Sequence, residues 1–126
     1  MLRHIFSILL VLSVFGCASA KPEKPHEVPV EFLSEDIEKQ VEIVAHRAER
    51  LPSGHVDVLL VCKSTEKKKP IWFDWKVIFI DGRGLRAEES EWHTEQAFPK
   101  LELTLRASSF KRDIANYRFL LRAPRQ

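Results

Sequence analysis

The chain has 126 residues, a length that suits one domain with a single modest hydrophobic core. Its 44% hydrophobic and 30% charged residues are typical of a globular protein and exclude a disordered one. The net charge of +2 is too small for the concentrated basic face of a nucleic-acid-binding protein, so we expect no nucleic-acid partner. The two cysteines are too few for a disulfide scaffold.

The start of the chain, residues 1–20, has the three parts of a secretory signal peptide and its cleavage region. A basic start, MLRH, is followed by the apolar run IFSILLVLSVF and then by the small residues of GCASA. The apolar run covers residues 5–15, which is short of the roughly 20 residues that a membrane-spanning helix needs. We therefore predict that residues 1–16 are a signal peptide and not a membrane anchor.

Two cleavage sites are compatible with this signal peptide. The stretch VFGC, ending at Cys17, resembles a bacterial lipobox, in which the cysteine is acylated and becomes the new N-terminus. Residues 18–20 also suit ordinary signal peptidase, which would release a soluble periplasmic protein after Ala20. We predict lipidation at Cys17, because a cysteine preceded by glycine at the end of an apolar run is rare by chance. Two or more acyl chains hold a protein stably at a membrane, and Ala18 favours the outer membrane by resemblance to enterobacterial lipoproteins.

The remaining chain is predicted to contain a linker and one folded domain. Ala18 to about Pro29 has three prolines and mixed charges without apolar periodicity, which is typical of a linker. We assign residues 17–33 to the acylated N-terminus and a flexible tether, and residues 34–126 to a β-sandwich domain.

Apolar residues alternate with other residues along most of this domain, which is the pattern of half-buried strands. The alternating positions are Val56, Val58, Leu60 and Cys62; Ile71, Phe73, Trp75, Val77 and Phe79; Leu101, Leu103 and Leu105; and Tyr117, Phe119 and Leu121. Residues 41–51 also alternate, although a helix beginning at Ser34 is an open alternative there. Four or five such strands separated by turn residues predict an all-β fold, an antiparallel β-sandwich.

The stretch VIFIDGRGL, residues 77–85, has the strand and the G-x-G that begin a dinucleotide-binding loop. Such a loop must open a helix whose N-terminus receives the phosphates, but a short polar stretch follows Gly84 and the third glycine is missing. The pair Asp81-Gly82 instead indicates a hairpin corner, in which both central residues can require a positive φ.

No motif in the sequence supports catalysis or a cofactor. Cys62 continues an apolar face, so we predict a buried and unreactive thiol. The five histidines lack metal-ligand spacing, and no nucleophile motif is present, so we expect no metal, no cofactor and no catalytic residue. Glu88, Glu89 and Glu91, and the run Lys67 to Lys69, are interpreted as solvated loop charges; the lysines alternatively contact anionic lipid or wall polymer.

The three tryptophans are the best candidates for recognition. Trp75 belongs to the predicted core face of its strand, whereas Trp72 points to the opposite face with Asp74 and Lys76. Trp92 lies in the polar segment after the corner, where it is either exposed or folded back over one end of the sandwich. Exposed aromatic residues are enriched at interaction hot spots, so Trp72, Trp92 and Arg83 form the candidate interaction surface.

The assembled pattern resembles the YcfL family of small bacterial envelope lipoproteins, whose function is uncharacterised. The resemblance covers roughly residues 40–123, and Asp81 to Leu85, a D-x-x-G-L corner, is its most specific part. It is carried by WFDWKVIFIDGRGL (72–85), the tryptophan loop at Glu91-Trp92, LELTLRASS (101–109) and IANYRFLLR (114–122). The chain departs from the family at residues 73–76, where the family has Tyr-Arg, and at Phe79-Ile80, where Trp or Tyr is usual.

The resemblance implies an immunoglobulin-like β-sandwich and a periplasmic location, and it transfers no catalytic residues. The departures conserve packing but alter any surface recognition at Asp74 and Lys76. In some enterobacteria a family member is encoded near a lipoprotein activator of peptidoglycan synthesis, which implies a role in envelope assembly by association only.

We therefore expect a non-enzymatic outer-membrane lipoprotein that faces the periplasm and presents a β-sandwich to an envelope protein partner. The alternative is a module that binds wall glycan or a small ligand through Trp72 and Trp92, with Lys67 to Lys69 nearby. A third hypothesis, an enzyme that relies on Cys62, requires a thiol that reacts in the native fold. Unpaired sheet edges would also permit strand addition by a partner or by a second copy of the chain.

Overall fold

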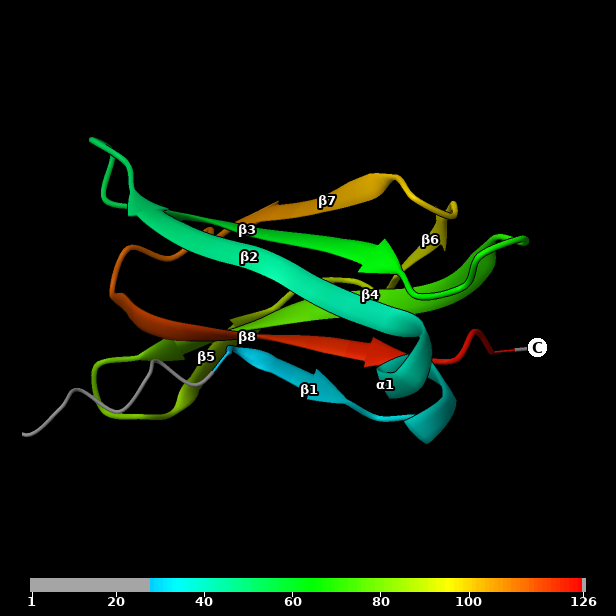
Figure 1. The fold of residues 1–126 in the computed structure, drawn as a ribbon. Coiled ribbons are helices and arrows are strands. Elements are labelled where there is room, and N and C mark those ends of the chain that lie inside the picture. The colour runs from blue at the N-terminus through cyan, green and yellow to red at the C-terminus, as the bar shows by residue number, and fades with distance from the viewer. Residues whose placement is uncertain (1–27, 126) are drawn as a thin grey trace, which may run out of the picture.

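The structure is a computed structural model that describes residues 28–125, which form two β-sheets packed face to face (Figure 1). The elements in chain order are β1 (Val30–Phe32), α1 (Glu35–Gln40), β2 (Val41–Arg50), β3 (Val56–Ser64), β4 (Ile71–Asp81), β5 (Arg86–Glu89), β6 (His93–Ala97), β7 (Glu102–Ser108) and β8 (Ile114–Arg122). In this part of the chain, no helix is long and apolar enough to cross a membrane. The predicted signal peptide (1–16), the lipidation site Cys17 and the alternative cleavage after Ala20 lie outside the described residues.

The larger sheet, sheet A, has the strand order β1-β8-β4-β5, and β6 also pairs with β4. β8 lies along one edge of β4, while β5 and β6 pair with different halves of the other edge. β1 runs parallel to β8, with Val30 opposite Phe119 and Phe32 opposite Leu121. The prediction of an antiparallel sandwich is wrong at this pair, so the fold is mostly β with one mixed sheet. Parallel pairing suits β1 because the whole domain, not a tight hairpin, connects it to β8.

β1 also corrects the predicted boundary of the tether. This strand lies inside residues 17–33, yet its backbone is already part of sheet A. Phe119 N donates to the carbonyl of Pro29 at 2.7 Å, and Leu33 N donates to the carbonyl of Leu121 at 2.8 Å. Three residues are too few to show a strand period, so this strand could not be distinguished from linker.

The smaller sheet, sheet B, has the strand order β2-β3-β7, and all its pairs are antiparallel. Both interpretations of the segment from Ser34 to Leu51 are partly correct. The one-and-a-half-turn helix α1 precedes β2, and Ile37 is its one residue buried in the core. The chain therefore passes from sheet A to sheet B through α1, and strand geometry begins at Val41.

The core lies between the sheets and contains most of the residues predicted from alternation. The inward positions of β3, β4 and β8 are buried, including Phe73, Phe79 and Phe119, which are among the largest fully buried side chains. Trp75 packs against Phe119 with ring centroids 5.9 Å apart, which confirms its predicted place in the core. Leu101 is the exception, since it precedes β7 and is 61% exposed.

Two further strands, β5 and β6, were not predicted, because their sequence is almost entirely polar. β5 and β6 fall in the segment RAEESEWHTEQA, where only Ala97 is fully buried. They form because β4 offers them an unpaired edge, and backbone hydrogen bonding satisfies that edge whatever the side chains are. The single segment after the corner thus completes sheet A.

Candidate interaction surface

The side of sheet A that points away from sheet B carries most of the candidate residues. Because side chains alternate along a strand, the core residues of β4 leave every second position facing outward. We define the outer face as Trp72, Asp74, Lys76, Ile78 and Ile80 of β4 together with their neighbours Arg118, Leu120 and Arg122 of β8. Ile78 and Leu120 are buried even on this side, so long polar side chains cover an apolar floor.

Trp92 lies on the outer face, between two cations. The Arg122 guanidinium carbon is 3.6 Å from the centroid of the indole, and Lys76 Nζ is 4.8 Å from it. Both distances suit cation–π attraction, which strengthens when the groups are shielded from water. Trp92 is half-buried, so it neither projects freely into solvent nor covers an end of the sandwich.

Asp74 holds Arg122 under the indole. Its carboxylate accepts hydrogen bonds from Thr94 Oγ1 at 2.7 Å, from Arg122 Nε at 3.3 Å and from Arg125 N at 3.4 Å. Asp74 is only 5% exposed, and burial alone would raise its pKa. The three donors outweigh burial, so the pKa of Asp74 lies below its ordinary value and the carboxylate stays charged. We call Asp74, Lys76, Trp92 and Arg122 the Trp92 cluster.

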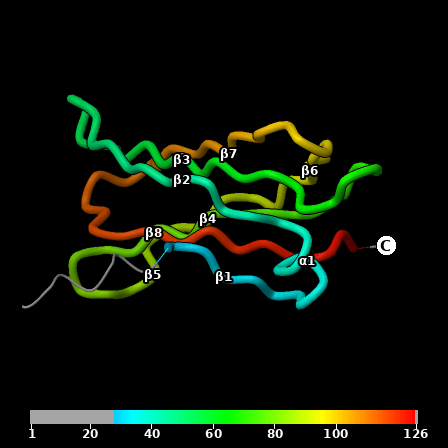
Figure 2. Tube along the Cα trace, viewed as in Figure 1, coloured from blue at the N-terminus to red at the C-terminus, as the bar shows by residue number. Residues whose placement is uncertain are grey.

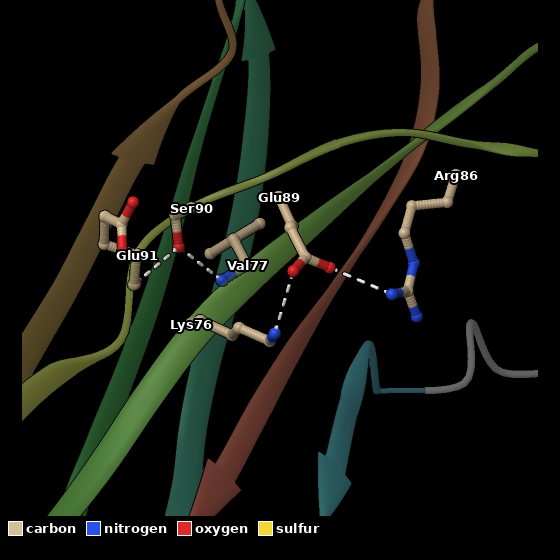
Figure 3. Close-up of polar contacts among 6 residues, drawn as sticks. All are labelled: Lys76, Val77, Arg86, Glu89, Ser90 and Glu91. Carbon is tan, nitrogen blue, oxygen red and sulfur yellow. Dashed lines mark hydrogen bonds and ion pairs between the residues drawn. The ribbon is translucent and has the colours of Figure 1, made fainter.

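The segment between β5 and β6 is fixed at the same face (Figure 3). Glu89 accepts from Lys76 Nζ at 3.2 Å and from Arg86 at 2.9 Å, and the hydrogen bond from Lys76 lowers the pKa of Glu89 most. Ser90 Oγ accepts from Val77 N at 2.9 Å and donates to the carbonyl of Glu91 at 3.0 Å. These contacts set the position of Trp92, which follows Glu91 directly.

Trp72 shares the outer face with the Trp92 cluster and is more open to solvent. It is two positions from Asp74 along β4, lies opposite Gln96 of β6, and is 53% exposed. The structure therefore brings the two predicted tryptophans to one side of one sheet. A large aromatic side chain that is half exposed beside a braced tryptophan is a reasonable contact point for another molecule.

Arg83, the third predicted residue, is not part of this surface. It lies in the β4–β5 corner, while Trp72 lies near the start of β4, so the 11 residues of that strand separate them by roughly 33 Å. The Arg83 side chain is largely exposed and pairs with Asp81 at 3.2 Å. The sequence could not show this separation, because it depends on the length of one uninterrupted strand.

The corner itself is confirmed as a hairpin turn and not a phosphate loop. β4 and β5 are antiparallel neighbours, and a strand, not a helix, follows Gly84. The predicted turn geometry is wrong, because Gly84 has a positive φ of 82° while Gly82 does not. The turn therefore has one residue with positive φ and not two. The Asp81 carboxylate stabilises it by accepting hydrogen bonds from Arg83 N at 2.9 Å and from Leu85 N at 3.1 Å. The backbone donor of Leu85 is the main reason that the pKa of Asp81 is lowered.

Cys62 and the charged runs complete the predicted candidates. Burial raises the pKa of Cys62 to about 12, with a smaller contribution from Glu95, and the side chain has no exposed surface. Glu88 is not simply solvated, since its carboxylate accepts from the backbone of Phe110 and Lys111. Lys67 to Lys69 are exposed in the loop that leads to Trp72. Among residues 28–125, no group of three or more His, Cys, Asp or Glu side chains has the arrangement of a metal site.

Comparisons with known proteins support the fold. No family model and no curated protein sequence matches the chain. Among solved structures, the chain is similar to Cj0090 from Campylobacter jejuni, with a TM-score of 0.63 and 12% identity over 76% of this chain and 98% of that one. It is also similar to a DUF1425 family member from Shewanella sp. pv-4, with a TM-score of 0.59 and 16% identity over 68% of this chain and 80% of that one. At these identities the similarity shows that the chain shares a sandwich-like β fold with these structures, and nothing more.

Proposed function

We propose that this protein is a non-enzymatic lipoprotein, anchored through Cys17 in the outer membrane, that presents the outer face of sheet A to a protein partner in the cell envelope. The sandwich is of the immunoglobulin-like type and the chain is a member of the YcfL family in this proposal. The solved structures of similar fold support it only in the fold, and the lipobox supports the anchor.

The observation that carries the proposal is the Trp92 cluster with Trp72 beside it. Tryptophan and arginine are the residues most enriched at hot spots, where they are rigid and shielded by neighbours. Here Asp74 orients Arg122, Arg122 and Lys76 flank Trp92, and Trp72 stays half exposed on the same face. Contacts within sheet A explain why the residues of the Trp92 cluster are there. They do not explain why the large apolar side chain of Trp72 is left exposed.

The test is cross-linking of the tagged lipoprotein in cells, followed by purification in detergent and mass spectrometry of what is recovered. A partner should be recovered with the unchanged protein and should fall at least tenfold with Trp72→Ala, since a hot-spot side chain contributes about 2 kcal/mol or more. Val44→Ala is the matched control, because Val44 is also an exposed apolar residue but belongs to β2 of sheet B. Equal recovery with both variants would exclude the outer face as the contact surface.

Binding of wall glycan is the second candidate, and a separate observation favours it. Three exposed lysines, Lys67 to Lys69, lie in the connection that leads to β4, and the exposed Trp72 is the second residue of that strand, so a cationic and an aromatic group lie at one end of β4. Anionic wall fragments would contact both groups. Soluble muropeptides should then shift the tryptophan fluorescence of the protein, and the shift should disappear in Trp72→Phe. If the fluorescence does not change with added muropeptide, glycan binding is excluded and the protein-partner proposal remains.

A further inference from the structure

Three connections lie at the same end of the sandwich, the end at which β1 begins (Figure 2). They are the β2–β3 connection (51–55), the β4–β5 corner (82–85) and the β7–β8 connection (109–113). Arg50 ties two of them together by donating to the carbonyls of Gly54 and Arg112. Val28 lines a pocket with Ile80 and Asn116, which lie next to the corner and near the start of β8. We call these three connections and Val28 the entry end.

Phe110 is the most exposed large apolar side chain of the entry end, at 89%. The loop that carries it is braced on two sides. Phe110 N and Lys111 N each donate to the Glu88 carboxylate, at 2.8 and 2.9 Å. Ser109 Oγ accepts from Val56 N at 2.9 Å and donates to the carbonyl of Lys111 at 2.7 Å. A rigid loop thus presents a phenyl ring to the surroundings although nothing in residues 28–125 covers it.

Basic residues adjoin Phe110 in the chain, and the Glu88 carboxylate that braces the loop is used by backbone donors. Lys111 and Arg112 follow Phe110 directly and are exposed, and no ion pair among the described residues includes either of them. Arg83 is largely exposed at the neighbouring corner, although it pairs with Asp81, and Asp113 is the one acidic residue of the loop. An exposed aromatic ring with adjacent lysine and arginine is the combination that favours a lipid headgroup region with negative charge.

Chain length sets which end of the sandwich can approach a membrane. Eleven residue steps separate Cys17 from Val28, so a chain acylated at Cys17 places Val28 within about 40 Å of the lipid even when fully extended. β4 alone is roughly 33 Å long, so the opposite end, with Phe98 and Leu101, would reach the lipid only if residues 18–27 spanned nearly their greatest possible length. The entry end, to which Val28 belongs, can contact the lipid at any separation shorter than this limit.

From these observations we infer that the entry end rests on an anionic phospholipid surface, with Phe110 in the headgroup region and Lys111 and Arg112 against lipid phosphates. This inference rests on the lipid anchor of the proposed function. It also orients the protein, because α1, the C-terminal residues and Trp72 then lie toward the end that faces away from the bilayer (Figure 1).

The test uses the full lipidated protein purified from membranes and placed in vesicles of phosphatidylethanolamine and phosphatidylglycerol. Phe110→Cys and Phe98→Cys each introduce one accessible thiol, because Cys62 is fully buried and Cys17 is occupied by its lipid. Each thiol is labelled with an environment-sensitive fluorophore. We expect emission at shorter wavelength, and quenching by a nitroxide lipid, at position 110 but not at position 98. Adding Lys111→Ala and Arg112→Ala, or about 1 M salt, should reverse most of the shift at position 110.

Each outcome decides one point. Equal emission from positions 110 and 98 in a protein whose mass shows acylation at Cys17 would overturn the inferred orientation and leave the anchor intact. A mass without acyl chains would overturn the anchor and this inference together. A shift at position 110 that persists in vesicles of phosphatidylcholine alone, and with both basic residues removed, would overturn the requirement for anionic lipid. Partner recovery that depends on Trp72 is measured separately, so its failure does not bear on the entry end.

Discussion

The two faces of β4 are buried for different reasons. On the inner face, Phe73, Val77 and Phe79 are buried because sheet B covers them with other apolar residues. On the outer face, Asp74 and Ile78 are also buried, but their neighbours on that face belong to other strands of the same sheet. One face is stabilised by contact with the other sheet, and the other by charges and an indole arranged along the sheet's own surface.

This difference determines what each face can do. The inner face depends on the area of apolar surface removed from water, so nearly any change of volume there is destabilising. The outer face depends on a few directional contacts, such as Arg122 between Asp74 and Trp92, which hold a recognition surface in one shape. A mutation of an exposed residue on the outer face, such as Trp72, should therefore change binding with little effect on folding.

The largest effect is expected on the inner face. Phe119 is fully buried and contacts the rings of Trp75 and Tyr117, so Phe119→Ala should lower the free energy of unfolding by about 3–5 kcal/mol. Urea unfolding followed by circular dichroism measures this loss. Leu101→Ala is the control, because that leucine is mostly exposed and should change the stability by no more than about 0.5 kcal/mol. Similar losses in the two variants would contradict the placement of the core.

The inner face was predictable from sequence because sandwich strands have a simple period. Phe73, Trp75 and Phe119 lie at alternate positions, and their burial requires only that a second apolar layer exists. β1 was not predictable, because three residues show no period and its parallel partner is more than 80 residues away in sequence. β5 and β6 were not predictable, because their strand geometry comes from backbone pairing with β4 and not from an alternating pattern of their own side chains.

The outer face was predictable only in part. Trp72 was placed correctly, since alternation from Trp75 and Phe73 fixes its side of β4. The arrangement around Trp92 could not be predicted, because it depends on Arg122, which is 30 positions away and arrives through the register of β8. Asp74 is the clearest case: a charged residue at an outward position suggests exposure to solvent, yet its three donors come from β6 and from the C-terminal segment that ends β8.

A change at Asp74 should have the next largest effect, and its size should depend on pH. Asp74→Asn removes the charge that pairs with Arg122, whose side chain is itself mostly buried, so at pH 7 we expect a loss of about 1–3 kcal/mol. Because the pKa of Asp74 is lower in the folded protein, its contribution is complete above the unfolded value of about 3.9. The contribution decreases as the pH falls through the folded pKa.

The stability gap between the unchanged protein and Asp74→Asn should therefore narrow below about pH 4. Urea unfolding at pH 7, 5 and 3 measures the gap directly. Asp113→Asn is the control, because Asp113 is exposed in the β7–β8 connection and its removal should leave a gap near zero at every pH. A gap at Asp74 that is constant with pH would mean that hydrogen bonding, and not the charge, accounts for its effect.

The smallest effects separate two cations that contact the same carboxylate. Lys76 and Arg86 both pair with Glu89, but the Lys76 side chain is 14% exposed and the Arg86 side chain is 61% exposed. Arg86→Ala should cause no resolvable change in urea unfolding, because solvent screens an exposed pair. Lys76→Ala also removes a cation from the face of Trp92, a contact worth about 0.5–2 kcal/mol when shielded from water. If both variants had the same free energy of unfolding, the contact between Lys76 and Trp92 would contribute no stability. The Trp92 cluster would then behave like an ordinary set of solvent-exposed ion pairs.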